Sequence, residues 1–197
     1  WWFLAAAVLA LWGGDVRAAD EITDDFGERV VLEHPARRVI ALTGAATETL
    51  CGMGLSGILA ARTDADLEPP AVAALPSIGT HMRPNLELVL AQQPDLVVQI
   101  AGRGESLEAA AAIRRMGIPV AVFDVHDFEG LFSMAERLGV LTGEPAAASR
   151  FVAGLRQRLD RVAEMVAGAA KRPTVFVEVR YPNLLAAGKD SMAADAV

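Results

Sequence analysis

Four short, mainly apolar runs, each followed by a stretch of helical composition, constrain the fold of this chain more than any other feature. They cover residues 38–42, 58–62, 96–100 and 119–123. A strand whose two faces are both buried reads as an unbroken apolar run, because neither face meets water. Strands of this kind alternating with helices predict an α/β lobe, in which helices cover both faces of a parallel sheet.

The segments around these runs carry turn and helix signals. Residues 22–32 predict a hairpin, with Asp24 to Gly27 as its turn, and the proline-rich residues 64–76 predict a loop. Helices are expected over residues 45–53, 84–92, 105–116 and 128–138. Three of them are followed by a glycine that is expected to end the helix, at Gly54, Gly117 and Gly139.

One much longer helix is expected over residues 145–170. Its apolar side chains recur at steps of four and three, which gives a single stripe: Phe151, Leu155, Leu159, Val162 and Val166. At 1.5 Å per residue this helix would be about 39 Å long, more than one small lobe requires. A rigid connection to a second lobe is therefore predicted, with residues 173–179 as the first strand of that lobe.

The predicted organisation has four parts. Residues 1–19 are expected to be a signal peptide without its basic start, because an apolar stretch precedes small residues suited to cleavage. This stretch is shorter than the ~20 apolar residues of a membrane span. The alternative is a buried N-terminal helix. Residues 20–144 form the N-terminal lobe, 145–171 the connecting helix, and 172–197 the beginning of a C-terminal lobe whose remainder is absent.

Composition narrows the possible functions. The hydrophobic fraction of 53% supports a folded core, and the net charge of -7 argues against nucleic-acid binding. Cys51 is the only cysteine, which excludes an intrachain disulfide and a cysteine-based metal site. The three histidines, His34, His81 and His126, do not have the spacing of metal ligands.

One apparent nucleotide motif is expected to be fortuitous. Residues 52–57 match the pattern GxGxxG, but a dinucleotide loop joins a strand to a following helix. Here the glycines follow a predicted helix and precede a predicted strand. No other catalytic motif is present in the sequence, so we expect a binding protein without enzymatic activity.

Several segments together resemble the periplasmic binding proteins of ABC importers for cobalamin, haem and ferric siderophores. The most specific is Asn85-Leu86-Glu87 followed by Gln93-Pro94-Asp95-Leu96-Val97-Val98. Similar segments are Val39 to Leu42 with Ala46 to Gly54, Leu75 to Gly79, Gly117 to Val120, Leu138 to Gly143, and Val175 to Ser191. The resemblance covers nearly all of residues 22–197 and depends on the order and spacing of these pieces.

The resemblance implies two α/β lobes that hold a ligand in the cleft between them. Cleft ligands lie on loops at the carboxyl ends of strands. The candidate ligand-binding residues are His81, Met82, Arg83, Arg103, Arg180 and Tyr181. The His81 imidazole would coordinate or stack on a metal macrocycle, and the arginines would pair with ligand carboxylates. The alternatives are a locally bonded histidine, solvated arginines, and a tyrosine packed on Pro182.

The resemblance also implies partners. Glu87 corresponds to a glutamate that docks on arginines of the permease in the inner membrane, although a carboxylate in a first helical turn also suits the helix dipole. The ligand is expected to be a ferric siderophore, haem or corrinoid. Cobalamin is less expected, because residues 63–70 lack tyrosines and residues 101–104 lack a tryptophan. No covalent cofactor and a periplasmic monomer are expected.

Two other functions remain open at this point. An enzyme or a metal-centre assembly protein can be built from the same paired lobes, since fold does not determine function. The position of Cys51 within a predicted helix argues against a metal-centre role. A ligand sensor that reports to a membrane receptor would suit an export signal equally well.

Overall fold

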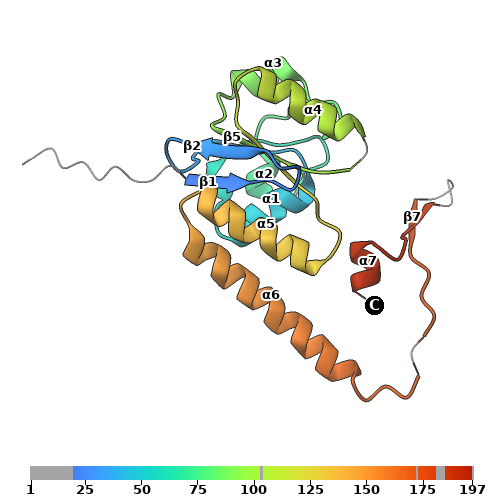
Figure 1. The fold of residues 1–197 in the computed structure, drawn as a ribbon. Coiled ribbons are helices and arrows are strands. Elements are labelled where there is room, and N and C mark those ends of the chain that lie inside the picture. The colour runs from blue at the N-terminus through green and yellow to red at the C-terminus, as the bar shows by residue number, and fades with distance from the viewer. Residues whose placement is uncertain (1–19, 103, 172, 181–184, 197) are drawn as a thin grey trace, which may run out of the picture.

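The computed structural model describes residues 20–102, 104–171, 173–180 and 185–196 (Figure 1). The predicted signal peptide, residues 1–19, lies outside the described residues. Within the described chain no helix combines the length and the apolar character that crossing a bilayer would require.

A parallel sheet of four strands forms the centre of the lobe. Its strands are β3 (Val39–Ala41), β4 (Leu59–Ala61), β5 (Leu96–Ile100) and β6 (Val120–Phe123), in the spatial order β4-β3-β5-β6. Each neighbouring pair is parallel. The four strands predicted from the apolar runs are therefore confirmed.

Helices cover both faces of this sheet, as the sequence predicts. The helices α1 (Gly44–Gly52) and α5 (Phe128–Leu141) pack on one face, and α3 (Leu86–Ala91) and α4 (Gly104–Arg115) on the other. In β3, β5 and β6, successive apolar residues enter the two cores alternately. Val98 packs with the α1 and α5 side and Val97 with the α3 and α4 side. This division explains why the strands read as continuous apolar runs.

The end of α5 differs from the prediction. Gly139 was expected to stop the helix, but α5 continues to Leu141, and the turn that follows contains Gly143 with a φ of +69°. Gly139 is buried inside the helix, where the beginning of the next helix lies against it. Its missing side chain serves close packing and does not terminate the helix.

The N-terminal hairpin protects the open edge of the sheet. Strands β1 (Asp20–Thr23) and β2 (Arg29–Leu32) pair antiparallel, as predicted. The amide of Asp25 donates to the carbonyl of Val122 at 3.1 Å, and the amide of Val122 donates to Oδ2 of Asp24 at 3.1 Å. The exposed edge of β6 is thereby supplied with hydrogen-bond partners from the turn, which removes a site for unwanted strand pairing.

Residues 64–76, predicted as a loop, contain one short helix, α2 (Pro70–Ala73). Pro70 occupies the first helical turn, where the absent N–H of proline has no helical partner to lose. The amides of Val72 and Ala73 both donate to the carbonyl of Pro69. A 3-10 turn, η1 (Ser56–Ile58), precedes β4.

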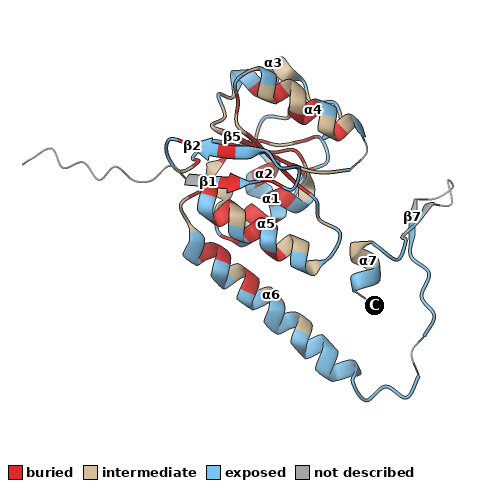
Figure 2. Cartoon of the chain, in the orientation of Figure 1, coloured by how far each residue is buried: buried red, intermediate tan, exposed pale blue. Residues whose placement is uncertain are grey.

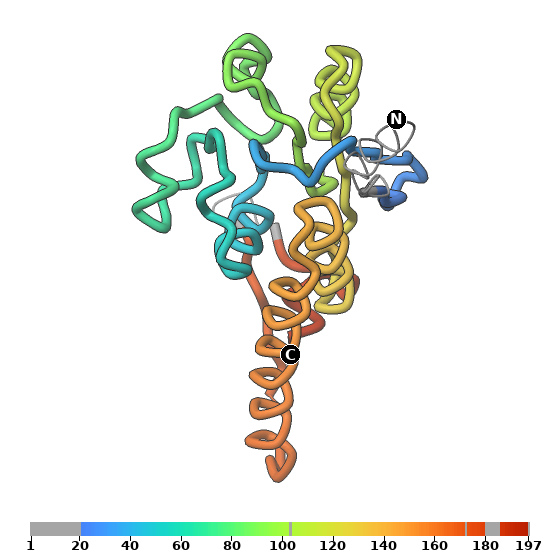
Figure 3. The backbone as a smooth tube through the Cα atoms, turned by 90° about the vertical axis from the view of Figure 1, so that its left-hand side faces the viewer, coloured from blue at the N-terminus to red at the C-terminus, as the bar shows by residue number. Residues whose placement is uncertain are grey.

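The long helix α6 (Pro145–Val166) is continuous, but it ends four residues before the predicted Ala170. Its first part packs against α5: Arg156 pairs with Glu129 at 2.6 Å and lies 4.3 Å over the ring of Phe132. Its last turns project away from the sheet (Figure 3). The apolar stripe is accordingly covered only in part, since Val162 is 56% exposed (Figure 2).

The chain after α6 forms β7 (Glu178–Arg180), β8 (Leu185–Ala186) and α7 (Met192–Asp195). The prediction of a strand over residues 173–179 is wrong for residues 173–177, which have no regular structure. Among the described residues, the apolar segment 173–179 has strand pairing only where β7 pairs antiparallel with β8. Phe176 in this segment remains 76% exposed.

Candidate functional site

The strand order places a reversal in the middle of the sheet. The chain runs from β3 outward to β4, then crosses back to β5 and continues outward to β6. Helix α1 therefore lies on one face and α4 on the other, and their N-terminal ends separate at the carboxyl ends of β3 and β5. Ligands of open α/β sheets bind in the crevice at such a switch point. This edge is the candidate binding site.

Unsatisfied polar atoms mark the same edge. Among the described residues, the buried side-chain atoms without a hydrogen-bond partner are Oγ1 of Thr43 and Oε1 of Gln99. Thr43 follows β3 and Gln99 lies near the end of β5, so both lie at the carboxyl ends of the two strands that flank the switch point. Buried polar groups are nearly always paired, and exceptions concentrate at functional sites.

A buried carboxylate organises the rim next to α1. Asp66 is 6% exposed, and its Oδ2 accepts from Oγ1 of Thr63 at 2.8 Å, from the Thr63 amide at 3.2 Å, and from Oγ1 of Thr47 at 3.4 Å. Gly44, the first residue of α1, approaches Oδ1 of Asp66 so closely that a Cβ there would lie 3.2 Å away. One carboxylate thus connects the loop after β4 to the first turns of α1.

The loop that contains three predicted ligand residues stands beside α4. His81 and Arg83 are exposed and Met82 is half-buried. Nη2 of Arg83 lies 2.9 Å from Oε1 of Glu105, in the first turn of α4. Arg83 therefore already has an acidic partner, which a carboxylate ligand would have to share or displace.

The other predicted ligand residues cannot be placed in the same way. Arg103 and Tyr181 lie outside the described residues. Arg180 is the last residue of β7, and its side chain is not described. The structure places the loop of His81, Met82 and Arg83 at this edge of the sheet. The positions of the side chains of Arg103, Arg180 and Tyr181 stay predictions.

The loop after β6 contributes polar groups to the same edge of the sheet. Nε2 of His126 lies 2.6 Å from Oδ1 of Asp124, both in the segment between β6 and α5. The C-terminal segment returns to this place, because the amide of Phe128 donates to Oδ2 of Asp195 in α7 at 2.8 Å. The chain beyond α6 therefore contacts the N-terminal lobe near the predicted cleft.

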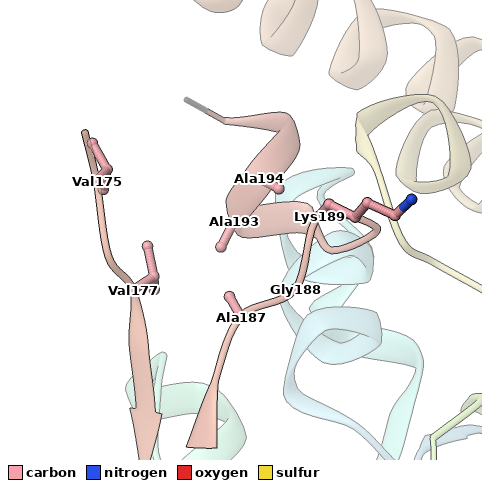
Figure 4. A pocket seen from close by; sticks show the side chains of 7 residues that line it. All are labelled: Val175, Val177, Ala187, Gly188, Lys189, Ala193 and Ala194. Carbon is pink, nitrogen blue, oxygen red and sulfur yellow. The ribbon is translucent and has the colours of Figure 1, made fainter. Parts of the chain in front are cut away.

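A pocket of about 320 Å³ lies elsewhere, within the C-terminal segment (Figure 4). It is lined by Val175, Val177, Ala187, Gly188, Lys189, Ala193 and Ala194. The ammonium group of Lys189 points away from the valine side chains in this view. Apart from Lys189, the side chains that line the pocket are small and aliphatic, so few side chains there could orient a metal chelate. We therefore place the candidate site at the switch point.

The described residues contain no group of three His, Cys, Asp or Glu side chains that could hold a metal ion. Cys51 is a free, half-buried cysteine on α1. Burial raises the pKa of its thiol, and the neighbouring carboxylates of Glu48 and Asp66 raise it further. A thiol in this setting is a poor nucleophile and a poor metal ligand, because both roles require the thiolate.

Glu87 lies in the first turn of α3 and is exposed. Asn85 caps this helix, because its Oδ1 accepts from the amides of Glu87 at 3.0 Å and Leu88 at 3.2 Å. The Glu87 side chain is therefore not needed as the cap and is available at the surface. The glycines of residues 52–57 begin at the last residue of α1 and precede β4, which confirms that this motif is not a dinucleotide loop.

Gln99 was not singled out from sequence, whereas Thr43 and Asp66 lie in segments, residues 43–45 and 63–66, that are expected from sequence to be cleft loops but without a role for either side chain. Gln99 carried a detectable signal, since it is the only polar residue in the four strands of the parallel sheet. Asp66 was hidden in a proline-rich segment where acidic residues are ordinary loop composition. Its network depends on contacts that the sequence does not encode locally.

The fold is a doubly wound lobe with a rim of loops at its switch point, and a long helix continues it into further α/β structure. This architecture is typical of a class of ligand-binding proteins. Comparisons with known proteins identify the same class. The family described as "Periplasmic binding protein" matches residues 39–197. The chain belongs to this family.

Individual relatives are distant. A vitamin B12-binding protein of Vibrio campbellii is 24% identical over 165 residues, which are 84% of this chain and 60% of the relative. Among solved structures, the periplasmic vitamin B12 binding protein of Vibrio cholerae has a TM-score of 0.71 at 22% identity, covering 82% of this chain and 62% of that one. A periplasmic heme binding protein from Pseudomonas aeruginosa has a TM-score of 0.64 at 26% identity, covering 72% and 52%. The chain thus spans about three fifths of the length of such relatives.

Proposed function

We propose that this chain belongs to the extracytoplasmic solute-binding component of an ABC importer, which captures a metal chelate and delivers it to a membrane permease. The observation that carries the proposal is the convergence at the switch point. Ordered loops, two buried oxygens without partners, and the loop of His81 to Arg83 all lie at this one edge. Such a rim is suited to binding and orienting a ligand.

The proposed ligand is a ferric siderophore, haem or corrinoid. In this proposal His81 coordinates the metal or stacks on the macrocycle, and Met82 adds apolar contact. Arg83 pairs with an anionic group of the ligand. The relatives support the corrinoid and haem parts of this range, since they are named for vitamin B12 and heme. Arg103, Arg180 and Tyr181 are proposed to complete the site.

Delivery is proposed to depend on Glu87. Its carboxylate is exposed at the N-terminal end of α3, whose cap is supplied by Asn85. Arginines on the permease would pair with it at a polar rim, where charge pairs determine orientation and association rate more than affinity. We propose that the protein acts as a periplasmic monomer without a covalent cofactor and without catalysis.

Calorimetric titration of the full-length protein with haem, ferric hydroxamate and catecholate siderophores, and cyanocobalamin tests the proposal. One of these probes is expected to bind with a dissociation constant of about 1 µM or lower, which corresponds to ~8 kcal/mol. His81→Ala should weaken that binding about tenfold, the net value of one good contact, whereas the exposed His34→Ala should not change it. Absence of binding to every probe would overturn the proposed ligand class.

A further inference from the structure

A buried glutamine connects the loop of residues 79–83 to the first turn of α4, beside the candidate site. Gln99 lies on β5 and is fully buried. Its Nε2 donates to the carbonyl oxygen of His81 at 3.2 Å and to the carbonyl oxygen of Ser106 at 3.2 Å. Because both partners are acceptors, the orientation of the amide is determined. One side chain thus joins the loop of residues 79–83 to the first turn of α4.

The other end of this amide is unsatisfied. Oε1 of Gln99 is buried and has no hydrogen-bond partner. A buried acceptor without a partner costs the desolvation that water would have repaid, and an apolar residue of equal size avoids that cost. All other residues of the four strands are apolar. The stability of the fold alone therefore does not explain why a glutamine occupies this position.

The same two loops are connected a second time at the surface. Arg83 pairs with Glu105 at 2.9 Å, and these two residues lie close in sequence to His81 and Ser106, which Gln99 bridges. The rim beyond β5 is also ordered, because the amide of Gly102 donates to Oγ of Ser106 at 3.1 Å. Exposed ion pairs contribute little to stability, so the buried amide is the main constraint on the relative position of the loops.

We propose that Gln99 is a positioning residue, which holds His81 to Arg83 and the start of α4 in the arrangement that meets the ligand. This inference rests on the proposed function and assigns a role to a side chain that does not itself touch the ligand. Ordering the loops before binding removes part of the entropy that binding would otherwise cost. Gln99 therefore contributes to affinity through the loops, while its unsatisfied Oε1 offsets part of the stability that its two hydrogen bonds provide.

The replacement Gln99→Met in the full-length protein separates the two effects, because methionine fills a similar volume without donors or acceptors. The urea midpoint is expected to change little, because the substitution removes the unsatisfied Oε1 together with the two hydrogen bonds that Nε2 donates. Backbone amides of residues 79–83 and 102–106 are expected to exchange hydrogen about tenfold faster, and the affinity for whichever of the four probes binds should fall about tenfold, the equivalent of one hydrogen bond. Gln157→Met, on the exposed side of α6, is the matched control and should change none of these.

Each other outcome has a defined meaning. A lowered urea midpoint with unchanged exchange in residues 79–83 would make Gln99 a purely structural residue and overturn the proposal. Faster exchange with unchanged affinity would overturn it as well. If the wild type binds no probe, the proposed function fails, while hydrogen exchange still decides whether Gln99 orders the loops.

A measurement on the wild type covers the case in which Gln99→Met does not fold. The side-chain amide protons of Gln99 should exchange slowly in nitrogen-edited NMR spectra, because both of the carbonyl oxygens that they contact are held in place by the fold. Exchange as fast as that of the exposed Gln157 amide would show that the bridge is not formed and would overturn the proposal.

Discussion

Gly139 on α5 and Ala148 on α6 lie so close together that a Cβ added to Gly139 would stand 2.6 Å from the Cβ of Ala148. The same added atom would lie 3.2 Å from Cα of Pro145 and 3.3 Å from the carbonyl oxygen of Glu144. The obstruction is thus largely backbone, which cannot rotate aside as a flexible side chain would. This contact fixes the base of the long helix on the N-terminal lobe.

The replacement Gly139→Ala is expected to destabilise the protein by about 1–3 kcal/mol, the usual cost of overpacking. Intrinsic helix propensity alone would predict a gain of about 1 kcal/mol. Gly154→Ala is the matched control, because Gly154 lies inside α6 and an added Cβ there meets nothing within 4 Å. Urea denaturation should therefore show opposite signs for the two variants, and equal gains for both would contradict the close contact.

The same glycine shows where sequence reasoning succeeds and where it stops. The β3 to β6 strands were predictable because burial on both faces leaves a local trace, an unbroken apolar run. Gly139 carries no such trace, since a glycine that ends a helix and a glycine that admits a neighbouring helix look alike in sequence. The strand expected over residues 173–177 failed for a related reason: apolar composition favours a strand, but pairing requires a partner that is distant in the chain.

The candidate site follows the same division. His81, Met82 and Arg83 could be proposed from resemblance, because their loop follows a recognisable motif. The pairing of Arg83 with Glu105 and the bridge from Gln99 could not, since both depend on how loops from different strands meet. The sequence indicates which residues carry chemistry, whereas the three-dimensional contacts decide which of them are held in position.

A second prediction concerns the buried pair of Asp24 and Arg114. Oδ2 of Asp24, whose side chain is fully buried, accepts from Nη2 of Arg114 at 2.6 Å. Removing the cation would leave a buried carboxylate short of a partner, so Arg114→Met should cost about 2–3 kcal/mol. Arg115→Met, at an exposed position on the same helix, should cost little. Similar urea midpoints for both variants would contradict a structural role for the pair.

A third prediction concerns pH. Partial burial raises the pKa of Asp25, but the hydrogen bonds from Arg137 and from the Asp124 amide, with the charge of Arg137, bring the net pKa below its ordinary value. A lowered folded-state pKa stabilises the protein above the unfolded-state pKa of about 3.9, and this stabilisation is lost as the pH falls through the folded-state pKa.

Asp25→Asn should therefore be less stable than the wild type at pH 7. The difference in the free energy of unfolding should diminish as the pH falls below about 3.9. Asp190→Asn, which replaces an exposed carboxyl, provides the control and should follow the wild type at every pH. Urea titrations at several pH values make the comparison. A difference that is independent of pH would show that the charge of Asp25 is not responsible.

The last prediction separates docking from ligand binding. Glu87→Lys reverses the charge at the exposed start of α3, while the cap from Asn85 to the Glu87 and Leu88 amides depends only on the backbone and persists. Binding of the chelate should therefore be unchanged, and uptake into cells that depend on this protein should fall at least about tenfold, as expected when a like charge faces the arginines of the permease. A cation at a helix N-terminus costs about 0.3–1 kcal/mol, which is too little to unfold the lobe. Glu108→Lys, an equal charge change on the exposed side of α4, should leave uptake intact, and equal uptake by the two variants would remove Glu87 from the docking surface.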